Sequence, residues 1–172
     1  MPPQEPSGPD DAFVDVLASN ARFASSFAHG GLPAYAGKGL AVVTCMDSRI
    51  EPLGMLGLQP GDAKILRNAG ARATKDVLRT LVLARYLLGV NRVMFIAHTK
   101  CRMAENTEAD VHDAIAAVGG PDSRSISFLT APDQEEALRI DVQRVRSWPY
   151  LADVVVGGFR YDLDTGVLTQ LC

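Results

Sequence analysis

Residues 41–49 read AVVTCMDSR and place reactive side chains directly after a short apolar run. The β-branched run predicts a buried strand over residues 41–44, with Cys45, Asp47 and Arg49 emerging at its carboxyl end. In open parallel sheets, ligands bind outside the carboxyl ends of the strands. We therefore expect the chemistry of this protein at the end of this strand.

Short apolar strands and helices of ten or more residues alternate along the rest of the chain. Further strands are predicted over 63–66, 92–97 and 153–157, a closing hairpin over 158–171, and the longer helices over 11–27, 74–88 and 132–147. The helix after Thr74 is apolar nearly all round, so we expect it to be covered on most sides. The alternation predicts an α/β fold with a mainly parallel central sheet of four to five strands, flanked by helices on both faces.

The size and composition of the chain favour one soluble globular domain. Its 172 residues are enough to bury a continuous core, and four prolines in residues 1–10 predict a flexible N-terminal arm before a single domain over 11–172. A formal charge of −3 without basic runs gives no reason to expect a nucleic acid partner. Residues 1–11 do not resemble a secretory signal and no apolar stretch is long enough for a membrane span, so we expect a cytoplasmic protein.

Three potential metal ligands follow two of the predicted strands. Cys45 ends the first, and His98 and Cys101 follow the strand over 92–97. Two thiolates and an imidazole suit Zn²⁺, and three protein ligands leave the fourth position for water or substrate. Taken singly, each would more often be a buried thiol or a hydrogen-bonded histidine. Because all three fall at one sheet edge, we favour a zinc site.

Asp47 and Arg49 alternate beside the first of these ligands. They could form a surface ion pair of little energetic value. Alternatively, Arg49 could hold Asp47 ionised in a bidentate pair, so that Asp47 orients a reacting water, accepts its proton or occupies the fourth metal position. Proximity to Cys45 favours a catalytic role for both residues.

Three motifs in this order resemble the β-class carbonic anhydrase family. They are CMDSR from Cys45, RNAG over 67–70, and His98-x-x-Cys101. The resemblance implies a zinc enzyme that interconverts carbon dioxide and bicarbonate, with Cys45, His98 and Cys101 as ligands and Asp47 with Arg49 as its dyad. It also implies a homodimer or homotetramer whose active sites lie at the dimer interface, with N-terminal helices laid across the partner. In some members the aspartate matching Asp47 binds the zinc.

The chain departs from the family pattern around the second motif cysteine. Ala97 and Arg102 stand where glycine is usual, and Lys100 stands where many relatives have aspartate. Arg102 could narrow the pocket or attract an anion. Because carbon dioxide is small and apolar, we expect a narrow apolar cleft, with Met46, Met103 or residues of a partner subunit as its walls. The candidates for the pocket or its loops are Met46, Asn68, Gly70, Arg102 and Met103.

Some alternatives stay open on the sequence alone. Arg67 and Asn68 belong either to a plain polar turn or to a loop packed near the metal, whereas Gly70 answers a backbone requirement. The same site could hydrolyse carbonyl sulfide or carbon disulfide. A third possibility is a non-catalytic zinc or redox-sensing protein in which Cys45 and Cys101 oxidise together.

Overall fold

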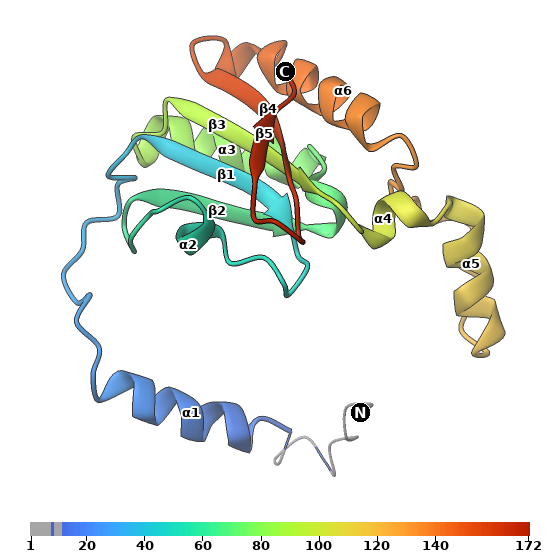
Figure 1. The fold of residues 1–172 in the computed structure, drawn as a ribbon, viewed down its shortest axis with the longest axis horizontal. Coiled ribbons are helices and arrows are strands. Elements are labelled where there is room, and N and C mark those ends of the chain that lie inside the picture. The colour runs from blue at the N-terminus through green and yellow to red at the C-terminus, as the bar shows by residue number, and fades with distance from the viewer. Residues whose placement is uncertain (1–7, 9–11) are drawn as a thin grey trace. The chain divides into compact units, whose positions relative to one another are not determined.

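The computed structural model describes residue 8 and residues 12–172 (Figure 1). Its contacts divide the chain into two units, residues 1–32 and 33–172, which are described separately here. Apart from Gly8, the flexible arm expected over residues 1–10 lies outside the described residues. A single domain over 11–172 stays a prediction.

A five-stranded sheet forms the centre of the larger unit (Figure 1). Its strands are β1 (Leu40–Cys45), β2 (Ala63–Asn68), β3 (Arg92–His98), β4 (Val155–Tyr161) and β5 (Leu168–Gln170). The spatial order is β2-β1-β3-β4-β5, in which the first four strands are parallel and β5 pairs antiparallel with β4. The predicted α/β class and the closing hairpin are therefore confirmed. Strand β4 runs four residues beyond its predicted end because it pairs with β3 as far as His98.

The two longest helices of this unit pack on one face of the sheet. They are α3 (Lys75–Leu87) and α6 (Gln134–Arg146), and their buried residues share one core with alternate residues of β1, β3 and β4. Thr74 begins α3 by accepting a hydrogen bond from the backbone N–H of Val77. Only one side of α3 is covered, because Leu83 and Leu87 are 42% and 64% exposed in this chain. The expectation that this helix is covered on most sides is therefore wrong for the single chain.

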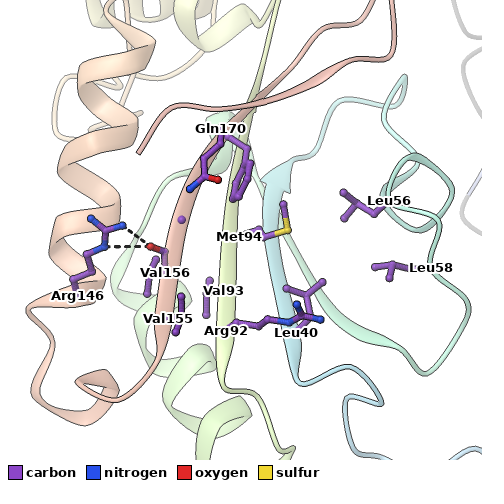
Figure 2. Close-up of a pocket in the computed structure, with 12 residues that line it drawn as sticks. Leu40, Leu56, Leu58, Arg92, Val93, Met94, Arg146, Val155, Val156 and Gln170 are labelled. Atoms are coloured by element: carbon purple, nitrogen blue, oxygen red, sulfur yellow. Dashed lines mark hydrogen bonds between the residues drawn. The ribbon is translucent and has the colours of Figure 1, made fainter.

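The opposite face of the sheet is covered only in part. The short helix α2 (Pro52–Met55) and the residues that follow it pack against Val42 and Ile96. Beyond them, a depression of about 470 Å³ lies on the face, with Leu40, Met94 and Phe159 among its lining residues (Figure 2). Helices thus flank both faces as expected, but unequally.

The remaining elements of the larger unit are short. They are η1 (Ala69–Ala71), α4 (Arg102–Glu105), α5 (Glu108–Ala117) and η2 (Pro149–Leu151). Residues 102–117 form two of these helices, α4 and α5. The break falls at Asn106, which is extended, and Thr107 begins α5 with a capping box to Asp110.

The smaller unit contains α1 (Val14–Ala24), which is shorter than the helix expected over 11–27. None of its residues is buried, and large apolar side chains such as Leu17 and Phe23 are 66% and 60% exposed. Among the described residues, no helix combines the length and apolar character needed to cross a bilayer.

Candidate metal centre

The register of β1 and β3 brings the three predicted metal ligands together. These strands are parallel neighbours in which Thr44 pairs with Ile96, so Cys45 and His98 emerge at the same edge. One ligand atom from each of Cys45, His98 and Cys101 lies within 4.8 Å of the other two, and all three residues are buried. Two sulfur atoms and one nitrogen at this spacing make a donor set suited to zinc.

The turn after β3 fixes which nitrogen of His98 faces the thiols. Nδ1 of His98 lies 2.9 Å from the carbonyl oxygen of Thr99 and donates its proton there. Nε2 is buried and has no hydrogen-bond partner among the described residues. A buried polar atom without a partner is unfavourable, whereas a free imidazole nitrogen beside two thiols is a ready metal ligand.

The pKa values of the two thiols shift in opposite directions. A hydrogen bond from Cys101 lowers the pKa of Cys45 to about 3, and the same bond raises the pKa of the Cys101 thiol. The backbone N–H of Gly70 donates a further hydrogen bond to Sγ of Cys45 at 3.4 Å. Burial opposes protonation of His98, but the Cys45 thiolate outweighs it and raises the pKa of that imidazole.

Asp47 and Arg49 form the bidentate pair that the sequence suggested. Nε of Arg49 donates to Oδ1 of Asp47 at 2.9 Å, and Nη2 donates to Oδ2 at 2.7 Å. These bonds hold the pKa of Asp47 well below its usual range. Nη2 of Arg49 also donates to the carbonyl oxygen of Lys100, which ties the pair to the turn between His98 and Cys101. An ionised Asp47 is therefore fixed beside the three ligands.

Comparison with known proteins identifies the family. Residues 40–120 match the family model described as carbonic anhydrase. β-Carbonic anhydrase 1 of Mycobacterium tuberculosis is 36% identical over 160 residues, which are 91% of this chain and 96% of that protein. The crystal structure of the carbonic anhydrase from Streptococcus mutans superposes with a TM-score of 0.87 at 34% identity, over 93% of this chain and 97% of that one. This chain belongs to the β-carbonic anhydrases.

A shorter match connects this β-carbonic anhydrase chain with a different hydrolase. The carbon disulfide hydrolase of an Acidianus species is 40% identical over 72 residues. That match covers 42% of this chain and 35% of the hydrolase, so it is far less extensive than the match to the mycobacterial protein.

Arg67 is a site residue that the sequence left undecided. Its Nε donates to the carbonyl oxygen of Cys45 at 2.9 Å, and its Nη2 donates to the carbonyl oxygen of Asp47 at 2.6 Å. Arg67 therefore holds the backbone that carries a ligand and the dyad. Its place at the end of β2, opposite Thr44 in β1, is the signal that could have assigned it.

Asn68 and Gly70 shape the turn behind Cys45. Asn68 closes the turn through two hydrogen bonds, from Nδ2 to the carbonyl oxygen of Arg72 and from the Arg72 N–H to Oδ1, both at 2.8 Å. Gly70 has a φ of 78°, and a Cβ on it would lie 3.2 Å from Cβ of Met103. The requirement for glycine is thus both conformational and steric.

The mouth of this β-carbonic anhydrase site is broad and charged in the single chain. A depression of about 760 Å³ is lined by Met46, Asp47, Ser48, Arg49, Lys100, Arg102 and Glu105. In the part of the single chain that the structure describes, the mouth is wider and more charged than the narrow apolar cleft that we expected, because Met46 is 68% exposed and charged side chains form most of the lining. Met103 does not line this mouth and packs with Cys45 and Cys101 instead.

Proposed function

We propose that this chain catalyses the reversible hydration of carbon dioxide to bicarbonate, with zinc held by Cys45, His98 and Cys101. The observation that carries the proposal is the buried Nε2 of His98, which has no hydrogen-bond partner among the described residues and belongs to a cluster whose three ligand atoms lie within 4.8 Å of one another. The similarity to carbonic anhydrases from two bacteria supports the same chemistry.

The residues around the ligands have separate tasks in this proposal. Bound zinc supplies a Lewis acid that makes a coordinated water more acidic. Arg49 keeps Asp47 ionised and points its carboxylate toward the ligand cluster, where Oδ2 lies 4.0 Å from Nε2 of His98. Asp47 then accepts a hydrogen bond from the reacting water and sets its direction of attack. Because Arg49 holds both oxygens of Asp47 in a bidentate pair, the carboxylate is fixed in place, and we assign it this orienting task.

The decisive experiment is stopped-flow hydration of carbon dioxide by the purified, zinc-loaded protein from pH 6 to pH 9. We expect a rate that climbs with pH, because deprotonation of the water generates the nucleophile. A protein that holds one zinc per chain and shows no hydration at any pH would overturn the proposal. That result would favour the non-catalytic zinc or redox-sensing alternative.

Carbon disulfide or carbonyl sulfide is the second candidate substrate, and the similarity to the Acidianus hydrolase supports it. Its test is release of sulfide from either compound by the same zinc-loaded protein. Sulfide release faster than hydration of carbon dioxide at equal substrate concentration would make these sulfur compounds the preferred substrates.

We further propose that the working form is a homodimer or a homotetramer. The exposed apolar residues of α1 and the open depression on the sheet are two surfaces that a second copy of the chain would cover. Partner residues near the mouth would also narrow it and make it less polar. The three free cysteines among the described residues suit the reducing cytoplasm, where we expect the protein to work without nucleic acid or membrane partners.

A further inference from the structure

A buried carboxylate lies behind the metal centre, on the apolar face of α6. Asp141 is 1% exposed and shares this face with Leu138, Val142 and Val145. Its Oδ2 accepts a hydrogen bond from Nε of Arg72 at 2.6 Å. Nη1 of Arg144 lies farther away, 3.7 Å from Oδ1. Burying a carboxylate is costly unless it is paired, so Arg72 is the main partner that stabilises Asp141 here.

Arg72 connects that carboxylate to the turn behind Cys45. Its side chain also donates to the carbonyl oxygen of Leu129 at 2.7 Å. Its backbone N–H and carbonyl oxygen both bond to the side chain of Asn68, which closes the turn. Both Gly70 and Ala71 have positive φ angles, 78° and 58°. For Ala71 this conformation is unfavourable, so the turn needs external restraint to keep its shape.

The contact between the turn and α6 is not fully packed. A cavity of about 10 Å³, the size of about one water molecule, lies between them. Gly70, Ala71 and Arg72 line it from the turn, and Leu138 and Asp141 are among the residues that line it from the helix. The Arg72–Asp141 ion pair lies beside this cavity and joins the turn to the helix.

The turn ends at a metal ligand. The N–H of Gly70 lies at its centre and donates to Sγ of Cys45 at 3.4 Å. Hydrogen bonds to a thiolate sulfur reduce its electron donation to a metal, and partners outside the ligand set tune metal affinity in this way. The position of the Gly70 N–H thus decides how strongly Cys45 donates.

We propose that Asp141 and Arg72 are positioning residues for the metal centre, which hold the Asn68–Arg72 turn so that the Gly70 N–H bonds Sγ of Cys45. The inference rests on the proposed zinc site. It makes the zinc affinity and the electron donation of Cys45 depend on two residues that are not themselves metal ligands. Nothing in this assignment depends on which molecule the enzyme turns over.

The test compares Asp141→Asn with Glu135→Gln, which removes a half-exposed carboxylate of the same helix from its pair with Arg160. Zinc affinity is measured by competition with a chelator. The cobalt-substituted proteins are compared by their sulfur-to-cobalt charge-transfer absorption. We expect Asp141→Asn to weaken zinc binding about tenfold, because the turn no longer holds Cys45 in its binding position. We also expect the absorption to shift to lower energy, because a thiolate that has lost the Gly70 hydrogen bond donates more electron density to the metal. Glu135→Gln should match the wild type in both measurements.

Arg72→Lys gives a second, milder variant should Asp141→Asn not fold. Lysine keeps the positive charge beside Asp141 but cannot also donate to the carbonyl oxygen of Leu129 as the guanidinium does. We therefore expect a smaller shift of the charge-transfer band in the same direction. A folded variant with reduced thermal stability and an unchanged charge-transfer band would overturn the inference, since the pair would then serve stability alone. Neither measurement requires catalysis. Zinc affinity and the charge-transfer band could therefore still be interpreted if the protein did not hydrate carbon dioxide. A wild-type protein that binds no zinc would overturn the metal site and this inference together.

Discussion

Nε2 of His98 and Oδ2 of Asp47 lie 4.0 Å apart, with the imidazole 1% exposed and the carboxylate held from its other side by Arg49. This separation is too long for a hydrogen bond. At this distance the carboxylate points toward the ligand cluster but does not occupy Nε2 of His98. A water bound at the cluster would therefore lie within reach of a fixed, ionised acceptor.

Replacing Asp47 with alanine should lower carbon dioxide hydration by about 100-fold, because a positioned acceptor for the reacting water is lost. Stopped-flow rates over the alkaline range measure the effect, and the zinc content should stay at the wild-type level. Asp76→Ala is the matched control, since it removes the aspartate of an exposed Asp–Arg pair on α3. Unchanged hydration in Asp47→Ala would rule out the orienting role.

Zinc affinity should fall as the pH falls from 8 to 6. The raised pKa of Cys101 means that zinc must displace its proton, and the raised pKa of His98 adds a second proton at the lower end of this range. One competing proton corresponds to about a tenfold loss of affinity for each pH unit. Competition with a chelator at pH 6, 7 and 8 measures the slope. Cys172→Ser should leave it unchanged, and an affinity independent of pH would contradict the protonation states described above.

Arg67→Ala should destabilise the protein by about 1–2 kcal/mol, because the carbonyl oxygens of Cys45 and Asp47 lose charged donors. Urea unfolding of the metal-free protein measures this change. Hydration by the zinc-loaded variant should also fall, because Asp47 loses the support of its backbone. Arg79→Ala, on the exposed side of α3, should change stability by less than about 0.5 kcal/mol. Wild-type stability together with wild-type activity in Arg67→Ala would show that neither bond matters.

The paired substitution Leu17→Asp and Phe23→Asp should convert the assembled protein to monomers. Each large apolar side chain buried by a partner contributes about 1.5–3 kcal/mol, and a carboxylate at the same place opposes burial. Sedimentation velocity measures the oligomeric state. Ser19→Asp adds a charge at a polar position of the same helix and should keep the wild-type assembly. A double variant that sediments like the wild type would exclude α1 from the interface.

The sequence predicted that Cys45, His98 and Cys101 would lie together, because strand ends obey simple geometry. Cys45 and His98 are 53 positions apart, yet each follows an apolar run, and neighbouring parallel strands present their carboxyl ends at one edge. The hairpin over 158–171 was recognisable in the same way, from its turn residues and its place after the last strand. These features need only local patterns and the rule for parallel sheets.

Other features depend on packing that local patterns do not record. Asp141 follows Leu138 by three positions and precedes Val145 by four, so it interrupts an apolar face, but its partner Arg72 lies 69 positions away. The broad mouth also escaped prediction, because the exposure of Met46 depends on how the loops after β1 and β3 diverge. The partial cover of α3 and of the sheet has the same origin, since apolar character does not reveal whether a segment is buried within one chain.

Hydrogen bonds within the chain shape the turn from His98 to Cys101. The N–H of Thr99 donates to the carbonyl oxygen of Tyr161, its hydroxyl accepts from Leu163, and Lys100 adopts a left-handed φ of 55°. The sheet and these bonds therefore meet part of the entropic cost of bringing the three predicted ligands together. Unlike a zinc finger, which folds around its metal, this protein is expected to be folded and receptive before any ion enters.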